Sequence, residues 1–77
     1  MASKETKQIA VAASAVLAQS PVTELRSLRV DEQSNQLQLH GRVRSFYHKQ
    51  LAQEAVLPLA GGLQVVNRVD VQAVAAQ

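Results

Sequence analysis

An alternating run of apolar and polar residues in the middle of the chain constrains the fold most strongly. Residues 37–45 read Leu-Gln-Leu-His-Gly-Arg-Val-Arg-Ser, so that Leu37, Leu39, Gly41 and Val43 occupy every second position. A period of two is typical of a strand with one face in the core and the other in solvent. A glycine inside such a strand indicates that a neighbouring segment approaches its backbone closely. The run therefore predicts a central strand.

Two further segments have the apolar spacing of helices. The first covers about residues 4–19, with Ser3 as its N-cap. It is expected to end at Ser20-Pro21, because the residue before a proline avoids the helical region. Its expected buried stripe consists of Ile9, Ala12, Ala13, Val16 and Leu17.

The second helix is predicted to begin at Phe46, with Ser45 as its N-cap. Pro58 should kink or end its last turn, and Gly61-Gly62 should complete the stop. Its apolar positions at helical spacing are Leu51, Ala52, Ala55, Val56 and Leu59.

Two shorter apolar runs complete the set of elements. Residues 28–31 predict a first strand, which the polar turn 32–35 joins to the central strand as a hairpin. Residues 63–71 predict a third strand, which a right-handed strand–helix–strand crossover makes parallel to the central strand if the two are adjacent. The order α-β-β-α-β indicates an α+β fold, with two helices on one face of a three-stranded mixed sheet. We expect one domain over residues 1–77, with its core at about 4–72.

Length and charge narrow the class of protein. A chain of 77 residues with a net charge of +2 is too mildly basic for a dedicated DNA-binding domain, and it has no cysteine for disulfides or thiolate metal sites. No apolar run reaches the roughly 20 residues needed to cross a bilayer. The run Ile9–Ala18 loosely resembles a secretory signal, but its alanines and the interrupting Ser14 favour a structural helix.

Catalytic and metal-binding patterns are not found. His40 and His48 fall on different elements without a nearby set of carboxylates, whereas a metal site needs three or four convergent ligands. The serines are interpreted as helix or cap residues rather than nucleophiles. We therefore expect no catalytic residue, no metal site, no cofactor and no enzymatic activity.

Basic side chains are expected on the open face of the sheet. If Leu39 and Val43 face the helices, alternation places the intervening residues on the opposite side. Such a face could bind anionic head groups or phosphates, because guanidinium groups bind them bidentately. The alternative is a solvated face with no ligand, and Asp31 and Asp70 would lie near it. The candidate anionic-surface residues are Arg29, His40, Arg42, Arg44 and Arg68.

An aromatic pair at the start of the second helix is the other candidate. Phe46, Tyr47 and Lys49 could form an interface with a membrane or a partner. Alternatively one ring completes the core and the other covers its edge. The scarcity of aromatic residues favours this second interpretation.

Several of these segments resemble the BON domain family of bacteria. The resemblance rests on Leu-x-Gly-x-Val-x-Ser at residues 39–45, on Ala52 and Ala55 in the following helix, on Gly61, and on Val-Val-Asn-x-Val-x-Val at residues 65–71. It covers about residues 9–71. Gly62 stands where the family usually has a hydrophobic residue. The resemblance implies the same two-helix, three-strand fold, a periplasmic location and binding of phospholipid membranes without catalysis.

These observations support three hypotheses of function. The leading one is a non-catalytic module that associates with anionic phospholipid surfaces. The second is a module for protein interaction or self-association, in which a sheet edge or the second helix contacts another chain or a second copy. Single-stranded RNA binding is disfavoured, because the sheet lacks aromatic stacking residues. As sequenced, the chain is expected to be cytoplasmic, whereas the family suggests the periplasm.

Overall fold

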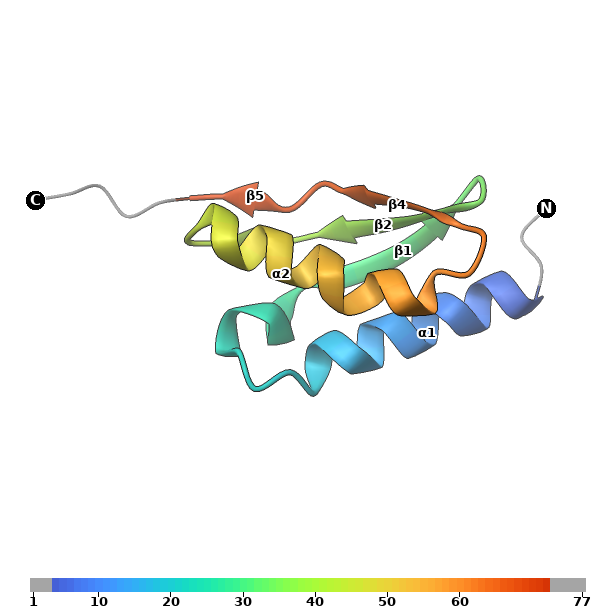
Figure 1. Ribbon diagram of the computed structural model, residues 1–77, viewed down its shortest axis with the longest axis horizontal. Helices are drawn as coiled ribbons and strands as arrows, with labels where there is room; N and C mark the ends of the chain where they lie inside the picture. The colour runs from blue at the N-terminus through green and yellow to red at the C-terminus, as the bar shows by residue number, and fades with distance from the viewer. Residues whose placement is uncertain (1–3, 73–77) are drawn as a thin grey trace, which may run out of the picture.

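The computed structural model describes residues 4–72 of the chain, and places the helices in one layer and the strands in another (Figure 1). The predicted N-cap Ser3 and the residues after Gln72 lie outside this range. In chain order the elements are α1 (Lys4–Ala18), the 3-10 helix η1 (Thr23–Ser27), β1 (Arg29–Gln33), β2 (Gln36–His40), β3 (Arg42–Val43), α2 (Phe46–Val56), the 3-10 helix η2 (Leu57–Leu59), β4 (Gln64–Asn67) and β5 (Asp70–Val71).

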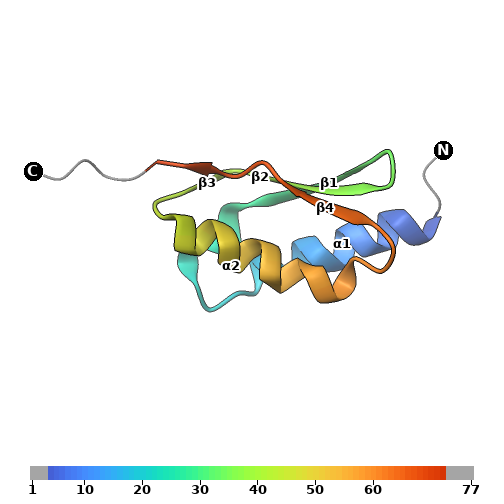
Figure 2. The same cartoon turned by 45° about the horizontal axis from the view of Figure 1, so that its top comes forward.

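The sheet has the predicted topology. β2 is central, pairing antiparallel with β1 and parallel with β4, while β3 and β5 continue the parallel pairing as a short second ladder. Both helices lie beneath the same face of the strands, and the other face is left uncovered by them (Figure 2). The α+β fold, with two helices on one face of a mixed sheet, is therefore confirmed.

Two predicted strands are interrupted at the same level of the sheet. Gly41 has φ +135° and separates β2 from β3, while residues 68–69 separate β4 from β5. The backbone ladder nevertheless continues past the interruption, because Arg68 N–H donates to the Leu39 carbonyl at 2.9 Å and Asp70 N–H to the Gly41 carbonyl at 2.9 Å. The two ladders thus form one curved surface.

The hairpin turn is shorter than predicted. Ser34 and Asn35 alone form it, with φ of 51° and 62°, whereas residues 32–33 belong to β1. Positive φ at both central residues is the mark of a tight two-residue hairpin turn, and its twist matches that of the flanking strands. This turn fixes the β1–β2 register, in which Val30 lies opposite Leu39.

The ends of α2 follow the sequence signals. The Ser45 hydroxyl accepts a hydrogen bond from His48 N–H at 3.2 Å, as an N-cap does. At the other end the helix changes to the 3-10 conformation at Leu57, one residue before Pro58, and Gly61 adopts φ +60°. The predicted effects of Ser45, Pro58 and the glycine stop are confirmed.

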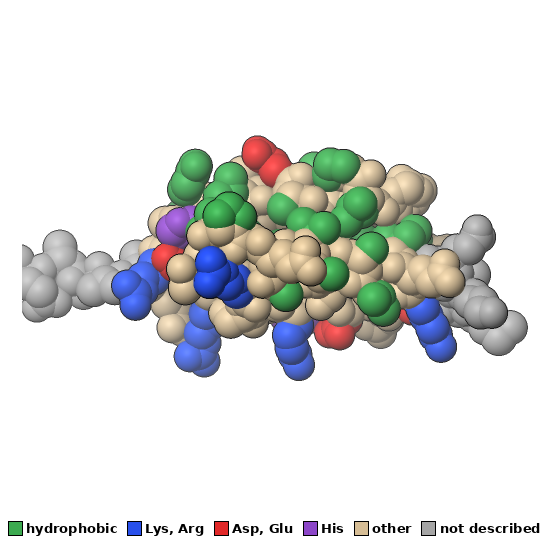
Figure 3. All heavy atoms as spheres, turned by 90° about the horizontal axis from the view of Figure 1, so that it is seen from below, with side chains coloured by type: hydrophobic (Ala, Val, Ile, Leu, Met, Phe, Trp, Pro, Cys, Tyr) green, Lys and Arg blue, Asp and Glu red, His purple; other side chains and the backbone are tan. Residues whose placement is uncertain are grey.

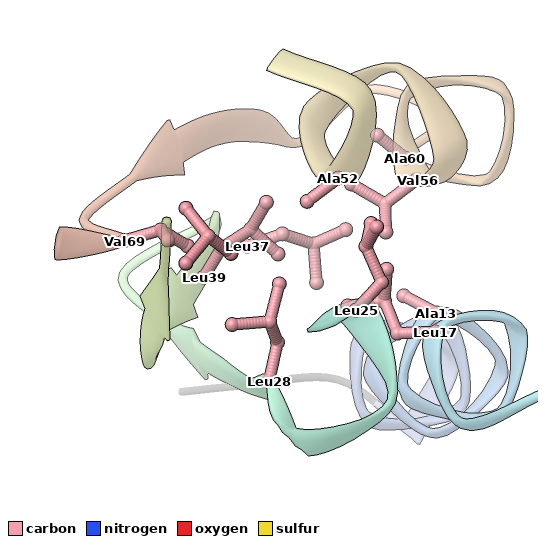
Figure 4. Close-up of a cluster of buried hydrophobic side chains, with 11 residues drawn as sticks. Ala13, Leu17, Leu25, Leu28, Leu37, Leu39, Ala52, Val56, Ala60 and Val69 are labelled. Carbon is pink, nitrogen blue, oxygen red and sulfur yellow. The ribbon is translucent and has the colours of Figure 1, made fainter. Parts of the chain in front are cut away.

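The core lies between the helices and the covered face of the sheet (Figure 4). Leu37 and Leu39 of β2, and Val69 between β4 and β5, point toward the helices, where Ala52 and Val56 of α2 lie, and all five are buried. Ala13 and Leu17 contribute the α1 side.

The predicted stripe of α1 is partly wrong. Ala12 is exposed and Val16 is 38% exposed, whereas Ala10 and Ser14 are half-buried. The reason is a rotation of the helix: its contact line is centred on Ala13 and Leu17, because α1 packs against β1 and α2 together.

Candidate functional site

The open face of the sheet carries its side chains in rows across the strands. Arg29 lies opposite His40, and Arg42 lies opposite Asp70. Arg68 lies beside the end of β2, where its backbone bonds to Leu39. At the far end of the same face the row is formed by Gln33, Gln36 and Gln64. The arginines are therefore concentrated at the end of the sheet nearest β3 and the start of α2.

Acidic residues lie among these cations. Asp31 Oδ2 is 3.3 Å from Nε2 of His40, so this histidine is paired across the β1–β2 hairpin. Asp70 stands directly opposite Arg42 in the β3–β5 register. The predicted basic residues share one face with these carboxylates, so the face is mixed in charge rather than uniformly positive.

Arg42 and Arg44 are brought together in a pocket of about 360 Å³. The pocket lies between η1 and the ends of β3 and β5, and its lining residues are Glu24, Ser27, Arg42, Val43, Arg44 and Gln72. Strand alternation places Arg42 and Arg44 on the same side, because Val43 between them is buried in the core.

Glu24 links η1 to β3 and to α2 beside this pocket. Its Oε1 accepts a hydrogen bond from the Arg44 backbone N–H at 2.6 Å, and its Oε2 lies 3.1 Å from Nδ1 of His48. The first contact satisfies an amide at the end of β3, and the second ties η1 to α2. The carboxylate therefore positions the connection between β3 and α2.

The Ser45, His48 and Glu24 side chains are close but do not form a catalytic triad. Ser45 Oγ lies 3.1 Å from Nδ1 of His48, the same nitrogen that contacts Glu24. A triad needs the serine and the carboxylate on opposite ring nitrogens, so that the base can take the proton of the hydroxyl. Here the contacts cap and anchor α2. Within residues 4–72, no group of three His, Cys, Asp or Glu side chains could hold a metal ion.

The aromatic pair is exposed at this same end of the molecule. Phe46 is 75% exposed and Tyr47 is 68% exposed, so the prediction that one ring completes the core is wrong. The physical reason is that the buried face of α2 runs through Ala52 and Val56, and the helical repeat of 3.6 residues per turn places Phe46 and Tyr47 on other faces of the helix. Lys49 is half-buried on the next turn, where its carbonyl accepts a hydrogen bond from Asn67 Nδ2 at 2.9 Å.

We call this region the β3–α2 end, defined by Arg42, Arg44, Phe46, Tyr47 and the pocket beside Glu24. Figure 3 shows the side covered by the helices: hydrophobic side chains are spread across it, and Lys and Arg side chains follow its lower margin. At its left end, hydrophobic, basic, acidic and histidine side chains lie next to one another. Cationic and hydrophobic groups thus share one end.

Sequence reasoning placed Asp31 and Asp70 near the basic face, but it missed the pairing of Asp31 with His40 and the position of Glu24. Asp31 could have been paired with His40 from the register of a two-residue hairpin. The position of Glu24 could not be predicted, because this residue lies 20 residues before Arg44 and meets it only through the packing of η1 on β3. Ser27 and Gln72 were not predicted either, because only tertiary packing brings them to the pocket.

The fold and this end define a class of small α+β binding module. The chain belongs to the BON domain family, whose model matches residues 5–73, nearly its whole length. This family consists of modules associated with phospholipid binding rather than catalysis. No curated protein and no solved structure matches the chain significantly. No helix within the described part is long and apolar enough to span a bilayer.

Proposed function

We propose that this chain is a non-catalytic module that associates with the surface of anionic phospholipid membranes through its β3–α2 end. The observation that carries the proposal is the exposure of Phe46 and Tyr47 beside Arg42 and Arg44. Tyrosine favours the membrane–water interface because its ring is apolar and its hydroxyl is polar, phenylalanine adds apolar area, and arginines favour the phosphate layer just above. The family membership supports the same role.

The expected contributions to the binding free energy predict that the protein binds membranes weakly. A cation near an anionic bilayer contributes about 1 kcal/mol, and partial burial of an exposed ring contributes a similar amount. Two arginines and two rings therefore supply about 4 kcal/mol, equivalent to a dissociation constant near 1 mM. Glu24 and the acidic residues of the sheet reduce this attraction, so binding should be visible only at millimolar lipid and low salt.

Sedimentation with vesicles tests the proposal. Wild-type protein should sediment with vesicles containing phosphatidylglycerol and stay in solution with pure phosphatidylcholine. The variant Phe46→Ala/Tyr47→Ala should lose about thirtyfold in affinity, because the two exposed rings together contribute about 2 kcal/mol of the binding free energy. Its unfolding midpoint should stay unchanged, since neither ring is in the core.

A matched control removes exposed apolar groups elsewhere. Val11→Ala/Leu57→Ala changes two exposed hydrophobic residues away from this end and should bind vesicles as the wild type does. Equal binding to neutral and anionic vesicles would contradict the proposal. Sedimentation velocity of the free protein over micromolar concentrations tests the alternative, because a self-associating module would show a concentration-dependent mass.

A further inference from the structure

The pocket at the β3–α2 end has a chemistry more specific than a basic surface. Arg42 and Arg44 line it with the hydroxyl-bearing Ser27 and the amide-bearing Gln72. These four side chains supply many hydrogen-bond donors, and two of them are permanent cations. At about 360 Å³ the pocket is near the lower end of the size of ligand sites. It suits a small anionic group rather than a large molecule.

The carboxylate in this pocket does not block an anion. Both Glu24 oxygens already have partners, the Arg44 backbone N–H and Nδ1 of His48. Those contacts hold the carboxylate on the pocket wall, where its remaining effect is a partial cancellation of the positive charge. A bound anion therefore meets the guanidinium groups rather than a free carboxylate.

We propose that this pocket binds a terminal phosphate, that is, a phosphate monoester. A terminal phosphate has three free oxygens and can accept from both guanidinium groups and from Ser27 together. A diester has only two free oxygens and leaves donors unpaired. The inference rests on the proposed function in one respect: the phosphate group is expected on the head group of a lipid, next to the exposed aromatic pair.

Titration with glycerol 3-phosphate tests the pocket in the absence of membranes. The amide NMR signals of Ser27, Val43, Arg44 and Gln72 should shift in a saturable way at millimolar ligand. The diester glycerophosphoglycerol, at equal ionic strength, should shift them at least fivefold less at the same concentration. Shifts that spread over all arginines, or that do not saturate, would overturn the proposal.

Two double variants of equal charge separate a pocket from a general charge effect. Arg42→Gln/Arg44→Gln removes both pocket arginines, while Arg29→Gln/Arg68→Gln removes two exposed arginines of the same sheet face that do not line the pocket. The first variant should lose the glycerol phosphate response, and the second should retain it. Equal losses in both variants would show that only the overall charge matters.

Glu24→Gln supplies a test that a folding defect cannot mimic. The amide keeps an oxygen that can accept from the Arg44 N–H and removes one negative charge from the pocket wall. Glycerol phosphate affinity should therefore rise by about two- to fivefold at low salt, in line with loss of one nearby opposing charge. An unchanged or lower affinity in the folded variant would contradict the assignment.

Vesicles identify the source of the phosphate. At matched surface charge, vesicles containing phosphatidic acid should bind at least fivefold more tightly than those containing phosphatidylglycerol, and Arg42→Gln/Arg44→Gln should abolish this preference. Binding to both lipids without a preference would refute a lipid as the source of the phosphate while leaving membrane association intact. A response to glycerol phosphate without vesicle binding would support the pocket, refute the lipid source and contradict the proposed function.

Discussion

Gly41 occupies the position where the fold leaves no room for a side chain. A Cβ atom built there would lie 2.5 Å from Cδ2 of Leu28 and 3.3 Å from its Cα. The backbone also has φ +135°, which only glycine adopts readily. The sequence signal, a glycine inside an alternating strand, therefore predicted a real close approach, although it could not name Leu28 as the neighbour.

Substitution of Gly41 by alanine should destabilise the protein by about 2–4 kcal/mol, because steric overlap in a packed core and backbone strain act together. Urea unfolding followed by circular dichroism measures this loss. Gly62→Ala is the matched control, since nothing lies within 4 Å of its Cβ position. A similar loss in both variants would contradict the role given to Leu28 and to the positive φ, because Gly62 has neither a close neighbour nor a positive φ.

At the scale of elements, the start of α2 depends on one hydroxyl. Ser45 Oγ accepts from His48 N–H at 3.2 Å. Replacement of an N-cap serine by alanine typically costs about 1 kcal/mol. Ser45→Ala should therefore lower the free energy of unfolding by about that amount, while Ser45→Thr should retain most of it.

Ser27→Ala provides a serine-to-alanine control at the end of η1. Its hydroxyl makes only a long contact of 3.5 Å to the Glu24 carbonyl, so its loss should change stability little. Equal stability of the Ser45→Ala and wild-type proteins in thermal unfolding would contradict a stabilising role of this cap.

Elements and their order were predictable, whereas their contacts were not. Proline, glycine and cap residues act locally, so the end of α2 at Pro58 and its start at Ser45 could be read from neighbouring positions. The buried line of α1 depends on which elements it packs against, and for that reason Ala12 and Val16 were placed wrongly. The 3-10 helix η1 could not be predicted, because its five residues carry no periodic signal and are held by the packing of Leu25.

For the molecule as a whole, alternation along single strands located the basic residues of the sheet. The alternation could not predict which side chains lie next to each of these basic residues. Tertiary packing brings Glu24 to the backbone N–H of Arg44, and Asp31 reaches His40 diagonally across the hairpin. The exposure of both aromatic rings was likewise not predictable, because a scarcity of aromatic residues says nothing about where the helix points them.

The arrangement of the whole molecule predicts that it is oriented on a membrane with the β3–α2 end toward the bilayer. The chain has one tyrosine and no tryptophan, so its intrinsic fluorescence reports on Tyr47 alone. If the β3–α2 end contacts the bilayer, Tyr47 should enter the interface, and lipids brominated near the glycerol end of their acyl chains should quench its emission. Lipids brominated near the chain ends should quench it far less, because a ring at the interface stays shallow.

Docking through the flat sheet face would give a different result. The Arg29, His40 and Arg68 row would then meet the phosphates, and Tyr47, on the helix at the end of the molecule, would keep its full emission while the protein still sedimented with vesicles. Arg29→Gln/Arg68→Gln serves as the control, since it weakens flat docking more than end docking. Quenching that persists in this variant and disappears in Arg42→Gln/Arg44→Gln would fix the β3–α2 end as the membrane contact, because only that end combines two arginines with two exposed rings.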